Sequence, residues 1–220
     1  MTPRSWREAR RYVLPALVAG TALLLARRRE AWVAFGVAGV VAGFFRDPER
    51  QLVAAPEVVY AAADGVVDAV DAAATDPWVP GEDAVRISTF LSLHNVHVNR
   101  SPVEGQITAT EASKGGYAPA FLGRSQANAR NRLAIDGKIG RVVVVQISGM
   151  VARKISCWVL PEDSVTAGQR IGLIHFGSRT DVLLPAGSVD VLVRPGDRVR
   201  SGITPLARHH EKKGTTCGST

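Results

Sequence analysis

Short runs of β-branched and other apolar residues recur from Val58 onward, and this recurrence limits the fold more than any other feature. Gly, Pro and Asp separate the runs at close intervals, as they do where strands are joined by turns. We therefore predict a mainly β fold, a compact many-stranded β domain of barrel-sandwich-like type. The predicted strands are Val58–Tyr60, Gly65–Val70, Val85–Ser88, Val96–Asn99, Gln106–Thr110, Arg141–Ile147, Lys154–Val159, Arg170–Ile174, Thr180–Leu184 and Val189–Val193.

Two uncharged apolar stretches precede this region, Tyr12–Ala26 and Ala31–Phe45, with three arginines and a glutamate between them. Each is shorter than the roughly 20 residues that a straight bilayer-spanning helix needs. The second apolar run, and the lack of a small-residue cleavage site followed by polar sequence, argue against a secretory signal peptide. Positive charge lies before, between and after the two runs, so it does not fix an orientation.

Three arrangements of the apolar runs stay open: two tilted short spans, two helices embedded from the cytoplasmic face, and a helical hairpin packed on a soluble core. The last would leave few polar positions to face water, so we expect membrane association. Residues 1–46 are predicted to form membrane-associating helices, an N-terminal helical anchor, and residues 47–220 the β-rich domain. We expect the protein at the cell membrane, with the β domain on the cytoplasmic side.

The formal net charge of +7 comes largely from arginines beside the apolar runs. Clustered arginines of this kind favour an anionic membrane surface, and basic and aromatic residues are not interleaved as a nucleic-acid platform requires. Neither Cys157 nor Cys217 belongs to a C-x-x-C or Cys/His cluster. This argues against a zinc site and against a disulfide framework, and it fits a reducing compartment.

Two other segments have weaker patterns. Residues Gly115–Asp136 lack clear periodicity and are predicted to form a long loop. His209 and His210 lie in a basic run near the end of the chain and are interpreted as a solvated tail.

Chemistry-bearing residues occur at three places. Asp64 stands in a turn before a predicted strand, His94 and His97 are three residues apart, and Ser178 follows Gly177. The histidine pair has no third metal ligand nearby, so no metal is expected. An aspartate, a histidine and a serine can instead divide the work of nucleophilic catalysis. The sequence around Ser178 lacks the G-x-S-x-G elbow of esterases, and the Gly177–Ser178 pair is either a bulge or a reactive bond.

The order of these motifs resembles that of the phosphatidylserine decarboxylase proenzymes, in their short branch (the archaeal, type II-like form). The resemblance covers nearly all of the chain after the first dozen residues. The motifs that carry it are Phe44–Pro48, Ala63–Gly65, His94–His97, Asn128–Asn131 and Phe176–Arg179.

The resemblance implies a proenzyme that cuts itself between Gly177 and Ser178, giving a β chain, 1–177, and an α chain, 178–220, that stay associated. Ser178 would become a covalent pyruvoyl (pyruvate) cofactor. Asp64 and His97 would form the processing triad with Ser178, and His94 would be the acid that reprotonates the product. The pyruvoyl carbonyl would condense with the amine of phosphatidylserine, a membrane lipid, and decarboxylation would yield phosphatidylethanolamine.

One departure and two alternatives accompany this interpretation. Long-form relatives are cut at Leu-Gly-Ser-Thr, and the chain ends in Cys217-Gly218-Ser219-Thr220, which we interpret as coincidence. A membrane-bound Ser-His-Asp hydrolase without self-cleavage is the first alternative. The second is a non-catalytic β module of the lipoyl or biotinyl carrier type, although neither Lys138 nor Lys154 has the expected apolar flanks. The sequence leaves open whether the protein forms a homo-oligomer.

Overall fold

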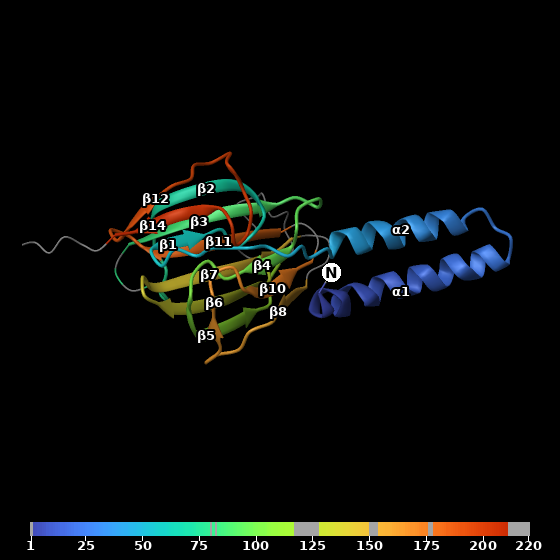
Figure 1. Cartoon of the computed structure of the whole chain (residues 1–220), viewed down its shortest axis with the longest axis horizontal. Coiled ribbons are helices and arrows are strands. Elements are labelled where there is room, and N and C mark those ends of the chain that lie inside the picture. The colour runs from blue at the N-terminus through green and yellow to red at the C-terminus, as the bar shows by residue number, and fades with distance from the viewer. Residues whose placement is uncertain are drawn as a thin grey trace, which may run out of the picture.

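The computed structural model describes residues 2–79, 81, 83–116, 128–149, 154–175 and 178–210. Two helices at the N-terminus form a hairpin that extends away from a body of β-strands (Figure 1). Among the described residues, the hairpin contacts the β body at its base. The helices are α1 (Pro3–Leu25) and α2 (Ala31–Phe44).

The ends of α1 follow from local chemistry. Thr2 caps its N-terminus by accepting a hydrogen bond from the amide of Ser5, and Pro3 stands at the first helical position, where no amide hydrogen is needed. At the other end Arg27 adopts a left-handed conformation with φ of 57°. The amides of Arg27 and Arg28 then bond back to the carbonyls of Leu24 and Leu23, which closes the helix with a Schellman motif.

The two helices pack closely where a small residue permits it. A Cβ added to Gly20 would come within 2.7 Å of the Phe35 ring, so glycine lets α1 approach α2 at this point. At the hairpin's base a separate apolar cluster joins both helices to the β body; it contains Ala9, Val13, Ala38, Phe44, Phe45, Val96, Val98 and Leu173. Among the described residues, no helix is both long enough and apolar enough to cross a membrane.

The β body contains one large sheet and two small ones. Eight strands, in the order β13-β2-β3-β11-β7-β6-β5-β9, form a sheet that curls into a half-barrel (Figure 1). Two three-stranded sheets, β1-β14-β12 and β4-β10-β8, accompany it. The strands are β1 (Val58–Tyr60), β2 (Gly65–Ala74), β3 (Ala84–Leu91), β4 (Val98–Arg100), β5 (Gly105–Ser113), β6 (Arg130–Gly137), β7 (Gly140–Ser148), β8 (Ile155–Cys157), β9 (Ser164–Val165), β10 (Arg170–Ile174), β11 (Ser178–Pro185), β12 (Val189–Val191), β13 (Arg198–Val199) and β14 (Pro205–His209).

The main core consists of inward-facing aliphatic side chains from this large sheet and its neighbours. Ile87, Leu133, Val144, Leu184 and Leu206 are among its fully buried members. Such residues supply most of the favourable free energy of folding, because they remove apolar surface from water. The prediction of a mainly β fold is confirmed.

Two sequence predictions were wrong. Residues 130–136, predicted to belong to a long loop, lie in β6, which pairs with β5 and β7. Its polar side chains are held by partners that lie far away in the sequence: Asn131 donates to Gln146, and Arg132 pairs with Asp76. Residues 117–127 of the same segment lie outside the described residues. His209, interpreted as tail, ends β14 opposite Val189.

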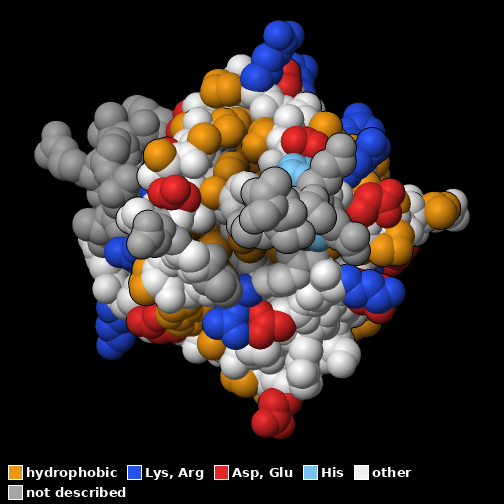
Figure 2. Space-filling view, turned by 90° about the vertical axis from the view of Figure 1, so that its left-hand side faces the viewer, with side chains coloured by type: hydrophobic (Ala, Val, Ile, Leu, Met, Phe, Trp, Pro, Cys, Tyr) orange, Lys and Arg blue, Asp and Glu red, His pale blue; other side chains and the backbone are white. Residues whose placement is uncertain are grey.

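The end of the β body that lies opposite the hairpin is shown in Figure 2. On the described atoms of this face, Lys and Arg are interspersed with Asp and Glu, and apolar side chains lie between them. His210 is exposed and pairs with Asp190 at 3.3 Å. A mixed surface of this kind is typical of a solvated face.

Candidate active site

Ser178 is the first residue of β11, a strand inside the eight-stranded sheet. Its backbone pairs with Leu91 of β3 on one side and with Ser148 of β7 on the other. The side chain is fully buried, and its Oγ has no hydrogen-bond partner among the described atoms. Buried polar groups are normally paired, so an unpaired hydroxyl is open to a chemical role. Ser88, Ser148 and Ser156 share this state, but only Ser178 follows the predicted reactive bond. Gly177, the other half of the predicted reactive bond, lies outside the described residues.

Asp64 lies at the same end of the sheet as Ser178. It comes directly before β2, whose first residue is Gly65. The backbone of Gly65 lies so close to β3 that an added Cβ would be 2.0 Å from the carbonyl oxygen of Phe90. Only glycine permits this approach. Because β2, β3 and β11 are consecutive in the sheet, the aspartate is held two strands away from the serine.

The carboxylate of Asp64 is bound by Arg50. Arg50 Nη1 donates to Oδ1 at 2.6 Å and Nη2 to Oδ2 at 2.8 Å, and the amide of Ser201 donates to Oδ1 at 2.8 Å. Bidentate arginine–carboxylate pairs are strong and fix the orientation of the carboxylate. The structure therefore brings Asp64 together with Arg50 and Ser201, and it shows no hydrogen bond between Asp64 and His97.

His97 is fully buried just before β4. Its carbonyl accepts a hydrogen bond of 3.2 Å from the amide of Ile174, the last residue of β10, which is the strand that leads toward Ser178. The imidazole lies against the ring of Phe44, with 4.3 Å between ring centroids. The connection between β10 and β11 thus starts beside His97.

The environment of His97 selects one protonation state and one tautomer. Burial lowers its pKa to about 4, with the positive charge of Arg46 as a smaller cause in the same direction and the negative charge of Asp64 opposing it. The ring is therefore neutral at pH 7. Nδ1 lies 3.0 Å from the carbonyl oxygen of Asn95, which can only accept, so the proton is assigned to Nδ1. Nε2 then carries a free lone pair and has no hydrogen-bond partner among the described atoms, as a general base requires.

His94 differs from His97 in exposure. It lies in the turn between β3 and β4, and its side chain is exposed. Its carbonyl accepts a short hydrogen bond from the Arg46 guanidinium, which ties this turn to the segment after α2. Its charge is also among the causes that lower the pKa of His97. The two predicted histidines are thus close enough to interact electrostatically, one buried and one facing solvent.

His175 is a buried group that the sequence analysis did not assign to the site. It follows β10 directly, and both ring nitrogens lack hydrogen-bond partners among the described atoms. Burial lowers its pKa to about 4, helped by the charge of Lys154. Glu8 of α1 lies 3.7 Å from Nε2 and also pairs with Lys154. The stretch before Gly177 therefore contacts the first helix.

Aromatic residues at the base of the hairpin cover both buried histidines. Phe44 packs on His97, Phe45 lies 5.2 Å from His175, and Tyr12 lies 6.1 Å from His175, as distances between ring centroids. Low polarity around these rings is what disfavours their charged forms. The same cover keeps water from this end of the sheet.

Arg50 and the aromatic cover were missed by sequence reasoning for one reason. The Phe44–Pro48 motif was noted only as a family signature, and Arg50 was assigned no role. An arginine two residues after a proline carries no local signal of its partner, which lies at Asp64. The signal that could have found it is the charge balance: a buried aspartate needs a cation.

Comparison with known proteins gives consistent matches. The family model described as phosphatidylserine decarboxylase matches residues 37–207. A phosphatidylserine decarboxylase proenzyme of Streptomyces griseus is 41% identical over 209 residues, covering 92% of each chain. One of Carboxydothermus hydrogenoformans is 43% identical over 166 residues, covering 75% of this chain and 78% of the relative. One of a Mycobacterium species is 41% identical over 201 residues, covering 88% and 85%.

Proposed function

The chain belongs to the phosphatidylserine decarboxylase family, and on that premise we propose that it cuts itself at Gly177–Ser178 and then converts phosphatidylserine to phosphatidylethanolamine. The observation that carries the proposal is the fully buried Ser178 hydroxyl, which has no partner among the described atoms and lies at the start of an inner strand. A hydroxyl kept for repeated attack on a bulky lipid would need access from outside. A hydroxyl that reacts with the adjoining peptide bond needs no such access before the chain is cut.

The proposed cleavage uses only groups of this chain and water. Ser178 Oγ bonds to the carbonyl carbon of Gly177 while the peptide C–N bond breaks, which gives an ester and a free amine on Ser178. Removal of the Ser178 Cα proton then expels the Gly177 carboxylate and leaves a carbon–carbon double bond in residue 178. Water adds, ammonia leaves, and the α chain begins with a pyruvoyl group.

His97 is proposed as the base for the first step. Its neutral ring has a free lone pair on Nε2, so it can take the Oγ proton and return it to the departing nitrogen. Asp64 acts through its negative charge, which opposes the effect of burial on the pKa of His97. Arg50 holds that carboxylate in place as a positioning residue.

The buried end of the sheet also suits the cofactor that this cleavage would make. A pyruvoyl group supplies an electrophilic carbonyl that accepts the electron pair freed when carbon dioxide leaves. The aromatic cover around His97 and His175 provides a site from which water is excluded. Exposed His94 is proposed to deliver the proton to the carbon that has lost carbon dioxide.

The position of the α chain supports continued association after cleavage. β11 lies between β3 and β7, β13 pairs with β2, and β14 pairs with β1. Ser201 of the α chain bonds to both Arg50 and Asp64 of the β chain. Breaking one peptide bond would leave these ladders and polar contacts in place, so we propose that the two chains remain one folded unit.

A decarboxylation assay tests the function directly. Purified protein mixed with phosphatidylserine in detergent micelles is expected to release carbon dioxide and to form an equal amount of phosphatidylethanolamine. A hydrolase would release fatty acid or head group without carbon dioxide, and a carrier module would do neither. Either of those outcomes, in protein shown to be folded, would contradict the proposed reaction.

The hairpin is proposed as the part that brings the enzyme to its lipid substrate at the cell membrane, with the catalytic domain on the cytoplasmic side. Large apolar side chains are exposed along both helices, whereas those of a soluble helix would face a core. Examples are Val18 (68% exposed), Leu25 (81%), Trp32 (71%), Val33 (69%) and Val40 (76%). An interfacial helix pair buries such side chains among the lipid chains.

Replacing Trp32 and Val40 together by serine is expected to weaken binding to phosphatidylcholine vesicles by about tenfold or more, because both side chains lose apolar area that lipid would bury. Co-sedimentation with vesicles measures the effect. Val53→Ser is the matched control, since Val53 is 96% exposed but lies outside the hairpin. Equal binding of all three proteins would rule out the hairpin as the membrane contact.

A further inference from the structure

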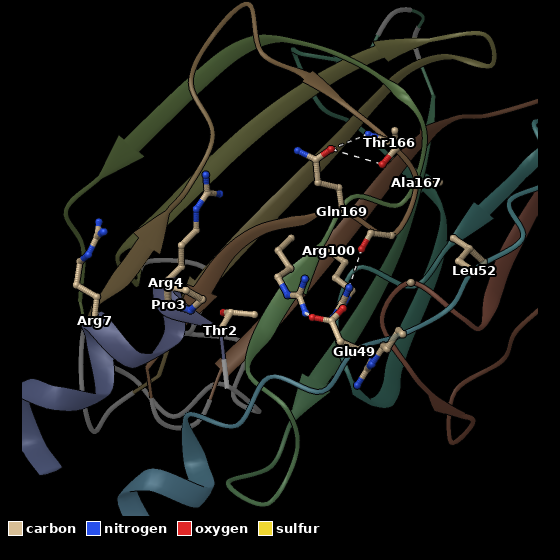
Figure 3. Close-up of a pocket in the computed structure, with 14 residues that line it drawn as sticks. Thr2, Pro3, Arg4, Arg7, Glu49, Leu52, Arg100, Thr166, Ala167 and Gln169 are labelled. Carbon is tan, nitrogen blue, oxygen red and sulfur yellow. Dashed lines mark hydrogen bonds and ion pairs between the residues drawn. The ribbon is translucent and has the colours of Figure 1, made fainter.

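A cavity of about 700 Å³ lies where α1 begins. Arg4 and Arg7 extend from the first turns of the helix on one side of it, and Arg100, Thr166 and Gln169 lie on the other (Figure 3). This volume is within the range of small-molecule sites, which is roughly 300–1,000 Å³. The ionisable residues that line it are Arg4, Arg7, Glu49, Arg50, Arg100 and Arg170.

The carboxylates around this cavity are already used by three of the arginines. Arg50 pairs with Asp64, as described above, and Arg170 pairs with Glu49 at 2.8 Å and with Asp47 at 2.7 Å. Arg100 also contacts Asp47, whose side chain is fully buried. Each of these carboxylates therefore already has an arginine partner.

Arg4 and Arg7 have no such partner. In the described part of the chain, neither guanidinium has a carboxylate within 4.0 Å, and the one hydrogen bond of Arg4 is a long one of 3.5 Å to the carbonyl of Trp158. Both residues are exposed and lie three positions apart on α1, so they face the same side of the helix. Together they give the cavity two positive charges that the protein does not neutralise.

Arg100, on the opposite wall, is a buried cation that lies near two other arginines. It is 4% exposed, and its Nε lacks a hydrogen-bond partner among the described atoms. Burial lowers its pKa, and the nearby charges of Arg170 and Arg50 lower it further, despite Asp47. An anion in the cavity would offset this repulsion.

The cavity is separate from the proposed catalytic site. Ser178, His97 and His94 do not line it. Arg50 is the link, because it lines the cavity and binds Asp64. A ligand here would contact the base of the hairpin and the β body together.

We propose that this cavity binds a phosphate group, most directly that of a membrane phospholipid other than the molecule being decarboxylated. Arginine guanidinium groups match phosphate oxygens in geometry and charge. The Thr166 hydroxyl and the Gln169 amide add polar groups across from Arg4. The cavity adjoins the start of the helix whose later turns expose apolar side chains, so a head group in it would have its acyl chains beside the hairpin. A soluble phosphate ester shares the same chemistry, and the experiment separates the two sources.

The test measures binding and does not depend on cleavage or decarboxylation. Full-length protein is titrated with phosphatidylcholine vesicles with and without phosphatidylglycerol, and separately with glycerol phosphate and inorganic phosphate. The preference is the ratio of the affinities for vesicles with and without phosphatidylglycerol. Arg4→Gln/Arg7→Gln is expected to lower this ratio by about tenfold or more. The matched control, Arg198→Gln/Arg208→Gln, removes the same charge from exposed positions on β13 and β14 and is expected to change it by less than about twofold.

The arginine substitutions could act by changing α1 itself, so a second variant changes the other side of the cavity. Gln169→Glu places a negative charge on the β side of the cavity and leaves the helix untouched, so it should weaken the preference by about tenfold as well. Saturable binding of glycerol phosphate or inorganic phosphate that is lost in the same variants would identify a soluble ligand. If the Arg4/Arg7 and Gln169 variants match the Arg198/Arg208 control in every titration, the cavity is not a phosphate site.

Discussion

Ser178→Ala is expected to remain a single 220-residue chain and to have no decarboxylase activity. The substitution removes the oxygen that attacks Gly177, which becomes the alkoxy oxygen of the ester and leaves with the Gly177 carboxylate. Denaturing electrophoresis and carbon dioxide release measure the two effects, and both are expected to be complete, not partial.

A matched variant separates this chemical loss from a packing effect. Ser88 is also buried, has an unpartnered Oγ, and lies on β3 opposite Asp181 of β11. Ser88→Ala removes the same atoms from the same pair of strands and should be cut and active like the natural protein. Cleavage of the Ser178→Ala chain at residues 177–178 would mean that another group starts the reaction.

His97→Gln is expected to slow self-cleavage by about 100-fold or more, which is the usual contribution of a general base. Glutamine is similar in size and can still donate to the carbonyl of Asn95, but it offers no basic lone pair. The fraction of cut chain against time after synthesis measures the rate. His209→Gln is the control, because it changes a histidine at the end of β14, which belongs to a different sheet from β4 and β10. Equal rates for the two variants would remove His97 from the mechanism.

The pH dependence of cleavage adds a second readout for the same residue. Burial lowers the pKa of His97 to about 4, so its basic form is already complete at neutral pH. The cleavage rate should be flat between about pH 6 and 8 and should fall as the pH approaches 4, where the ring takes up a proton. A rate that fell steeply between pH 7 and 6 would indicate a base with the ordinary histidine pKa of about 6.5.

Much of the fold could be predicted because its signals are local. Strands such as β10 and β11 combine β-branched and other aliphatic residues, and the helices are continuous apolar runs with arginines at their ends. β6 was missed because the polar run Arg130, Asn131 and Arg132 interrupts the alternation of apolar and polar residues that indicates a strand. In the folded chain Asn131 bonds to Gln146 and Arg132 pairs with Asp76, and no local pattern reports such distant partners.

The site was predictable only in its parts. The residue types and order of Asp64, His94, His97 and Ser178 carried the family resemblance, and the family itself is confirmed by the comparisons. The individual roles of these residues remain proposals. Contacts that cross the fold could not be predicted: Arg50 on Asp64, Phe44 on His97, and Glu8 beside His175. They depend on how the hairpin sits against the sheet, which the sequence does not encode locally.

The proposed self-cleavage is tested most directly by the mass of the purified protein. Under denaturing conditions a mass spectrum should contain two chains, residues 1–177 and a chain from 178 to 220 whose first residue is a pyruvoyl group. Under native conditions the two chains should appear as one complex, because β11 stays paired with β3 and β7. A single intact chain in protein that decarboxylates phosphatidylserine would contradict the account, as would a shorter chain that begins with an unmodified serine.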